Sequence, residues 1–216
     1  MAQMQVEALT TPYLQFGEVQ WWYFPNSSGI TFYDDYTKTE FQNQHGRAIH
    51  TFTSNDDSPD PYLEEKAFLP GLIGSFTSAI RGFVRATYPQ TKFEVLYPHD
   101  VNDHLLTRAV NYSDTDWTSG NLEVLKTENF TYTGSRDMNK ALESIRFPQQ
   151  KGFALGQAAH LVGVFNASEP WNWERRLSKS EGVTEVVFWA FDQFAMIGYS
   201  LPLYEGVRRA QFLGRA

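Results

Sequence analysis

A glutamate followed closely by aromatic residues is the part of this sequence with the clearest chemical potential. The residues up to Gly17 have the apolar pattern of a short strand, Glu18 comes next, and Trp21 and Trp22 follow shortly after. A carboxylic acid beside an apolar wall keeps its proton near neutral pH, and indole faces stack on sugar rings. These residues indicate a glycosidase-type site with Glu18 as the general acid/base. The alternative is a strand that runs into an aromatic loop, with Glu18 solvated or salt-bridged.

Glycoside hydrolysis needs a second carboxyl group, about 5 Å from the first in retaining enzymes and further away in inverting ones. Asp100 and Asp192 each come at the end of a predicted strand, and Glu169 lies shortly after another. Each of these three could instead have a structural role. The aromatic residues that we expect to bind substrate are Trp21, Trp22, Tyr33, Trp171 and Trp189, with packing in the core as the alternative, above all for Trp189.

Other kinds of catalytic or binding site are not indicated. The sequence contains no cysteine, which excludes disulfides, thiolate metal sites and a cysteine nucleophile. His45 and His50 are five residues apart with no third ligand nearby, so we expect no metal. The sequence has neither a phosphate-binding glycine loop nor a dinucleotide fingerprint, so we expect no cofactor.

The composition and charge indicate a globular domain that avoids phosphates. A chain of 216 residues with 42% hydrophobic residues is long enough to bury a sizeable core. The formal net charge of −7 argues against nucleic acid as a partner. No apolar stretch approaches the about 18 residues of a membrane span, so we expect no membrane partner. The N-terminal residues lack the basic and apolar blocks of a signal peptide, and the localisation stays open.

Strand and helix patterns alternate along the chain. The predicted strands are residues 12–20, 92–97, 122–125 continuing at 129–132, 160–165 and 183–191. The predicted helices are residues 29–52, 62–87, 103–110, 135–145, 173–179 and 204–213, with a short strand at 48–53 as an alternative, a bend at Pro70 and a linker at 147–152. About five strand–helix units imply parallel strands joined by right-handed crossovers. The fold class is therefore α/β, as an open doubly wound sheet or as part of a (β/α) barrel.

Three segments together resemble a known kind of barrel. The strand ending at Glu18, the segment 29–34 and the segment 93–102 resemble the later half of (β/α)8 barrel modules. These modules are similar to glycoside hydrolases and occur in bacterial and phage-tail-like proteins. The resemblance covers residues 13–203 and implies that residues 1–216 form a single domain, the C-terminal part of a barrel.

The resemblance also implies roles for particular residues. If the first strand is the fourth of the barrel, Glu18 takes the acid/base position. The seventh strand then ends at Asn166, where a retaining glycosidase has its nucleophilic glutamate. Asn166 is therefore a candidate for substrate binding, and its identity favours the alternative function, a non-catalytic structural or carbohydrate-binding module. Either function makes carbohydrate the expected ligand.

An incomplete barrel also predicts a partner. An eight-fold barrel has about 250 residues, so about three units are missing before the first strand. Five units leave two open sheet edges, which proteins usually cover. We therefore expect a homodimer or an upstream half-barrel segment. We also expect Glu18, Asp100, Asn166 and Asp192 to share one rim, because parallel strands end at the same edge of a sheet.

Overall fold

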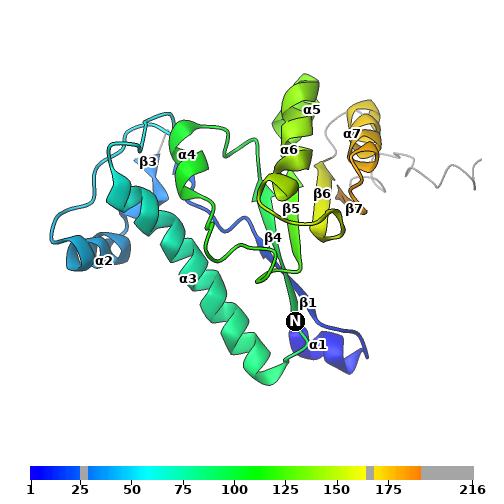
Figure 1. Cartoon of the computed structure of the whole chain (residues 1–216), viewed down its shortest axis with the longest axis horizontal. Helices are drawn as coiled ribbons and strands as arrows, with labels where there is room; N and C mark the ends of the chain where they lie inside the picture. The colour runs from blue at the N-terminus through cyan, green and yellow to red at the C-terminus, as the bar shows by residue number, and fades with distance from the viewer. Residues whose placement is uncertain (25–28, 164–167, 191–216) are drawn as a thin grey trace, which may run out of the picture.

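The computed structural model describes residues 1–24, 29–163 and 168–190. Five strands form one sheet in which every neighbouring pair is parallel. Their order in the sheet follows their order in the chain: β1 (Tyr13–Gly17), β4 (Lys92–Pro98), β5 (Val124–Glu128), β6 (Ala158–Gly163) and β7 (Glu185–Trp189). Helices lie between successive strands (Figure 1). The predicted α/β class and partial barrel are confirmed as a half-barrel, since these five strands show no reversal of order that would define a doubly wound sheet.

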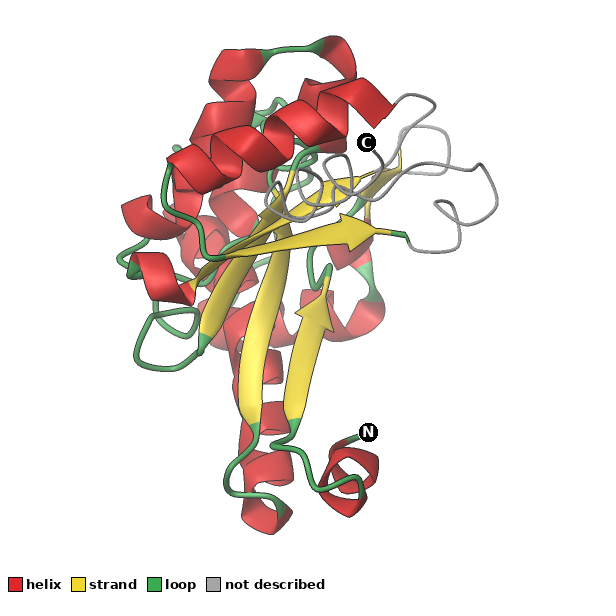
Figure 2. Cartoon of the chain, turned by 90° about the vertical axis from the view of Figure 1, so that its right-hand side faces the viewer, coloured by secondary structure: helices red, strands yellow, loops and turns green. Residues whose placement is uncertain are grey.

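Most of the helices lie on one side of this sheet. They are α1 (Ala2–Glu7), α2 (Asp35–His45), α3 (Leu63–Thr87), α4 (Leu105–Val110), α5 (Phe130–Ser135), α6 (Met138–Gln150) and α7 (Ser168–Ser180). Figure 2 shows the strands in front and most of the helices behind or above them. Two short strands, β2 (Tyr23–Phe24) and β3 (Gly29–Ile30), pair antiparallel outside the main sheet. Two 3-10 helices, Thr31–Tyr33 and Leu155–Gln157, complete the described elements.

The face of the sheet that meets the helices is apolar. Phe93 and Tyr97 of β4 are buried in the main core cluster together with Leu125 of β5 and Ile73 of α3. The ring of Phe147 in α6 stacks on the ring of Tyr97, with their centroids 4.7 Å apart. Because successive side chains of a strand point to opposite faces, the residues between these project to the other side of the sheet.

That other face carries charged side chains that neutralise one another. The Lys126 ammonium donates to Glu94 Oε1 at 2.6 Å and to Gln15 Oε1 at 3.3 Å, and Glu185 Oε1 lies 3.5 Å from it. The side chains of Lys126 and Glu94 are both buried. Branched apolar residues usually fill the interior of such barrels. This half-barrel therefore departs from that rule and pairs its buried charges within its own chain.

Two predicted segments after β5 fold differently. Residues 129–132, predicted as strand, begin α5, because the Thr133 N–H and hydroxyl both bond to Asn129 and close a helical turn. Residues 147–152, predicted as a linker, include the last turn of α6. Pro148 removes one backbone donor there. The packing of Phe147 against Tyr97 and Tyr112 keeps the turn helical.

The predicted helix at 29–52 is much shorter in the structure. Asp34 caps α2 by accepting from the Thr37 N–H at 2.9 Å, and Gly46 ends the helix with a left-handed backbone, φ 68°. The alternative strand at 48–53 does not form. The predicted helix at 204–213 lies outside the described residues.

The long helix α3 continues through Pro70 without dividing. By length and composition alone α3 could cross a membrane, contrary to the sequence analysis. One side of it packs closely on the protein: the Trp117 indole donates to Thr77 Oγ1 at 3.0 Å. A Cβ added at Gly74 would lie only 2.2 Å from an oxygen of Asp116. These contacts fit a helix on the surface of a globular domain.

Residues 46–62 connect α2 to α3 and are fixed by one buried carboxylate. Glu65 accepts from Arg47 Nη1 at 2.7 Å, from Arg47 Nη2 at 2.9 Å and from the His50 N–H at 2.8 Å. Burial opposes the ionisation of Glu65, but these hydrogen bonds outweigh it and lower the pKa of Glu65 to about 2. The ion pair of Arg47 and Glu65 therefore fixes the position of residues 46–62, a loop that contains neither helix nor strand.

Replacing Arg47 with Met should destabilise the protein, because it leaves the buried Glu65 carboxylate without its cation. Urea unfolding followed by circular dichroism measures this loss. The matched control is Arg146→Met, whose pair with Glu181 lies at the surface and should contribute much less to stability. Equal losses in the two variants would contradict this account.

The same pair predicts a pH dependence. The pKa of Glu65 falls from 4.5 to about 2 on folding, so the pair stabilises the fold fully above pH 4.5. The stability difference between wild type and Arg47→Met should shrink as the pH falls toward 2, because the buried Glu65 of the variant, without its cation, takes up a proton at a higher pH than Glu65 of the wild type. Unfolding curves at several pH values measure this change.

Candidate functional site

The carboxyl ends of β1, β4 and β5 bring three carboxylates to one rim of the sheet. Glu18 follows β1 directly, Asp100 follows β4 closely, and Glu128 is the last residue of β5. Glu128 is only 7% exposed, and burial, then the charges of Glu18 and Asp100, raise its pKa to about 7. The structure thus brings the predicted residues Glu18 and Asp100 together. It adds Glu128, which the sequence analysis missed because it ended this strand at residue 125.

The surroundings of Glu18 differ from the expected sugar cleft. Its backbone is left-handed, φ 55°, and its side chain is exposed. Trp21 lies against α3, where its indole donates to the Leu69 carbonyl at 3.1 Å and meets the ring of Phe32 edge to face. Trp22 is half-buried beside the β2–β3 ribbon. Trp21 therefore fastens the segment after β1 to a helix.

Asp100 has a structural role in the rim. Its two carboxylate oxygens accept from the Thr131 N–H at 2.7 Å and from the Val101 N–H at 3.0 Å. These bonds tie the loop after β4 to the start of α5. The neighbouring His99 packs edge to face against Phe147, and burial lowers its pKa to about 4, so it is neutral near pH 7.

Two aromatic residues expected to bind substrate are internal supports instead. Trp171 is fully buried, because α7 turns its ring toward Phe188 at 5.1 Å, which corrects its placement at a cleft. The Tyr33 hydroxyl donates to the His50 carbonyl at 2.9 Å, and burial raises the pKa of Tyr33 to about 12. Both residues stabilise the fold.

The remaining predicted residues are separated from this rim or lie beyond the described structure. Trp189 is exposed at the end of β7. Glu169 belongs to the first turn of α7, and its side chain lies outside the described part of the structure, as do Asn166 and Asp192. Within that part, only Glu18 and Asp100 of the predicted carboxylates come together.

The titratable pair of His160 and Glu174 is buried away from solvent. His160 Nε2 lies 2.7 Å from Glu174 Oε1, and His160 Nδ1 lies 2.9 Å from Thr127 Oγ1. All three residues are buried, with Thr127 on β5, His160 on β6 and Glu174 on α7. The pair locks α7 to the sheet and is inaccessible to a substrate. Across the described residues, no group of three or more His, Cys, Asp or Glu side chains could hold a metal ion.

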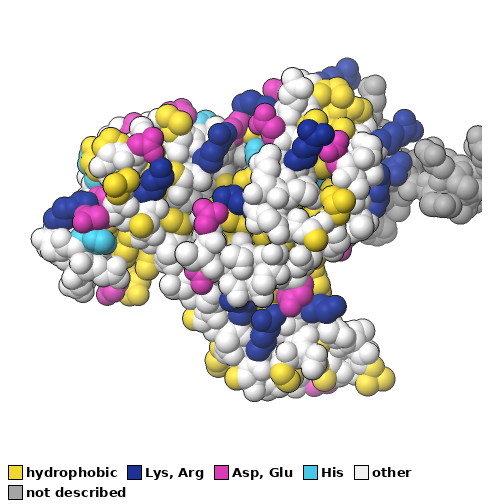
Figure 3. Space-filling model, viewed as in Figure 1, with side chains coloured by type: hydrophobic (Ala, Val, Ile, Leu, Met, Phe, Trp, Pro, Cys, Tyr) yellow, Lys and Arg dark blue, Asp and Glu magenta, His cyan; other side chains and the backbone are white. Residues whose placement is uncertain are grey.

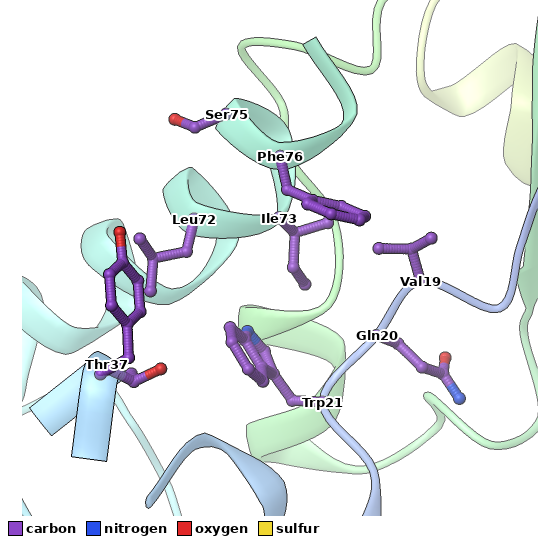
Figure 4. A pocket seen from close by; sticks show the side chains of 9 residues that line it. Val19, Gln20, Trp21, Thr37, Leu72, Ile73, Ser75 and Phe76 are labelled. Atoms are coloured by element: carbon purple, nitrogen blue, oxygen red, sulfur yellow. The ribbon is translucent and has the colours of Figure 1, made fainter. Parts of the chain in front are cut away.

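An apolar groove lies beside the carboxylate rim. Its volume is about 600 Å³, and it opens between α2, α3 and the segment after β1. Its lining residues are Val19, Gln20, Trp21, Tyr36, Thr37, Leu72, Ile73, Ser75 and Phe76 (Figure 4). None of them carries a charge, so the groove lacks the paired carboxylates that glycoside hydrolysis requires.

A comparison with known families decides the relationship of this chain. The family model described as the TIM barrel of the non-contractile tail sheath protein matches residues 1–199. The chain belongs to this family. No curated protein and no solved structure matches the chain. The match supports the predicted barrel and its phage-tail-like occurrence, whereas a relation to glycoside hydrolases is not shown.

This family overturns the prediction of a glycoside hydrolase with Glu18 as general acid/base. A tail sheath domain favours the other function considered from the sequence, a non-catalytic structural module. Carbohydrate as a partner is likewise not supported. The aromatic residues that suggested sugar stacking are explained in part by packing, since Trp21 and Trp171 both contact the core.

The raised pKa of Glu128 can be tested by substitution. Folding raises this pKa from 4.5 to about 7, so the folded state holds a proton that the unfolded state releases, and stability falls as the pH rises through this range. Relative to wild type, Glu128→Gln should therefore gain up to about 3 kcal/mol between pH 4 and pH 8. The exposed Glu143→Gln is the control in the same urea unfolding series. If the stability difference between Glu128→Gln and wild type is the same at both pH values, the pKa of Glu128 is not raised.

Proposed function

We propose that this chain is a non-catalytic structural domain that self-associates within a tail sheath. The observation that carries the proposal is the match of residues 1–199 to the TIM barrel of the tail sheath protein. A sheath consists of many copies of its protein, so such a domain needs surfaces that contact neighbours. The half-barrel supports the proposal in two ways, through its charges and through its edge.

The charges on the open face of the sheet are already paired. Lys126 meets Glu94 and Glu185 within the chain. A binding or catalytic site keeps groups available for its ligand, but here the buried ammonium of Lys126 is paired with its own neighbours. The face therefore has the character of a structural layer.

The first strand leaves an edge that a neighbour can extend. The Tyr13 N–H and C=O point to the free edge of β1, where the side-chain amide of Gln5 bonds to both, at 2.9 and 3.1 Å. Because this direction alternates along a strand, the backbone groups of Gln15 and Gly17 face the same edge. Exposed edges of this kind are usually covered. A second copy or another segment of the sheath protein would cover this one.

The proposal predicts assembly without hydrolysis. Light scattering on the 216-residue chain should show a mass that rises with concentration. Glu18→Gln should leave this rise unchanged, because Glu18 follows the last residue of the free β1 edge. A parallel screen with aryl glycosides and polysaccharides should show no turnover in either protein. A constant monomer mass up to the solubility limit, or turnover that Glu18→Gln abolishes, would contradict the proposal.

A further inference from the structure

The apolar groove continues along an uncharged face of α3. Phe76 lines the groove and is 55% exposed, and Phe83, two turns further along the same helix, is 83% exposed. The other exposed residues between them are small and neutral: Ala79 and Gly82. Scattered exposed apolar residues are common, but a groove and an adjoining apolar helix face mark an interaction surface. The structure leaves this surface open over the described residues.

The turn between α1 and β1 presents a matching apolar projection. Leu9 is 95% exposed and has a left-handed backbone, φ 58°, which is costly for a bulky residue. Met4 and Val6 on α1 are exposed beside it in sequence. Figure 3 shows hydrophobic side chains reaching the surface at the lower end of the molecule, where Figure 1 places α1.

Hydrogen bonds hold this projection in a fixed shape. The Leu9 N–H donates to the Val6 carbonyl at 2.9 Å, and the Thr10 N–H donates to the Gln5 carbonyl at 2.9 Å. The Gln5 side chain in turn anchors the turn to Tyr13 of β1. These backbone bonds close the C-terminal end of α1, and they account for the left-handed backbone of Leu9, whose apolar side chain stays in solvent. The exposed Leu9 side chain is therefore available for contact with another molecule.

We propose that the α1–β1 turn of one copy, with Leu9 at its tip, binds the α3 groove of the next copy. This inference rests on the proposed function, because a sheath supplies neighbouring copies. The turn and the groove lie at different places on the molecule: α1 lies near the end of α3, and the groove lies beside α2 (Figure 1). A contact between two different surfaces repeats from copy to copy and generates rings or helices, which is the geometry of a sheath.

Charge favours a second copy over the other occupants of an apolar groove. Two copies with a formal net charge of −7 repel each other, so they meet best where neither surface is charged. The groove lining carries no charged residue, and neither Leu9 nor Met4 nor Val6 carries a charge. An anionic membrane attracts basic segments, which the exposed face of α3 between Phe76 and Phe83 lacks.

Three side chains bury far less than the about 800 Å² per partner of a standard interface. The contact is therefore weak alone and gains strength by repetition.

Chemical cross-linking tests this contact directly, because the chain has no native cysteine. Leu9→Cys and Phe76→Cys are made as separate proteins, mixed in equal amounts and treated with a short bismaleimide. The expected product joins the two different chains, at a yield roughly fivefold above that of Leu155→Cys mixed with Phe76→Cys, because binding raises the effective concentration of the two thiols. Leu155 is an exposed control outside both surfaces.

Charge substitutions provide a second readout. Leu9→Asp and Phe76→Asp should each lower the average mass of the assembly and leave the unfolding midpoint nearly unchanged, since both side chains are exposed. An equimolar mixture should regain one contact per pair of chains, because each variant keeps the surface that the other lacks. Leu105→Asp, exposed on α4, is the control and should assemble like wild type.

Several outcomes would overturn the inference. Assembly that persists in both Asp variants, without a cross-link above the Leu155 control, rejects this contact and leaves the proposed function standing. Cross-links between two Phe76→Cys chains in preference to mixed products indicate a two-fold α3 contact instead. Flotation of a monomeric chain with phosphatidylcholine–phosphatidylglycerol vesicles, lost in Phe76→Asp, indicates a membrane. A chain that never associates contradicts both the contact and the proposed function.

Discussion

The packing of α3 and α6 on one face of β4 is the interaction on which the rest of the structure depends. Ile73 and Phe147 meet Val95 and Tyr97 in the main core cluster. This packing sets which side chains of every neighbouring strand turn toward the helices, because parallel pairing carries the alternation across the sheet. A slip of one residue would move Glu94 into the apolar layer. The free energy of burying the apolar face therefore fixes the register of the sheet.

The composition of the other face follows from the same register. Glu94 and Lys126 point away from the helices and neutralise each other there. At the end of the strands the same alternation brings Glu128 to the rim beside Glu18 and Asp100. The rim resembles the strand-end site of a barrel enzyme in residue type. One of its carboxylates, Asp100, has a structural role, since it holds the start of α5. The indole of Trp21, which follows Glu18, holds the segment against α3.

Strands that are short, apolar runs were predictable from the sequence. Residues 92–97 lie in β4, and residues 160–163, the described part of the predicted strand 160–165, lie in β6. Segments whose form depends on distant contacts were not predictable from the sequence. The helix at Phe147 continues past Pro148 because Phe147 packs against Tyr97 and Tyr112, which are distant in the chain. The local residue pattern of the α5 segment predicts a strand, but the segment forms a helix because Asn129 bonds to Thr133 and closes the first turn. Local pattern thus predicts the sheet better than the helix ends.

The candidate site was predictable only in part for a similar reason. The position of Glu18 after a strand is visible in the sequence, and so is that of Asp100. The burial of Glu128 and the orientation of Trp171 depend on how β5 and α7 pack, which no spacing in the sequence reveals. Residue types at strand ends therefore predicted that Glu18 and Asp100 end on the same side of the sheet, and could not predict whether these carboxylates perform chemistry.

The central claim is that this half-barrel is a structural domain of a tail sheath, joined to its neighbours through surfaces of its own fold. Cryo-electron microscopy of the assembled sheath that contains this chain tests the claim most directly. The account predicts that each domain contacts the next through described surfaces such as the α3 groove, and that no ligand density occupies the rim at Glu18 and Glu128. Domains that stand isolated from one another, with glycan density bound between these carboxylates, would contradict it.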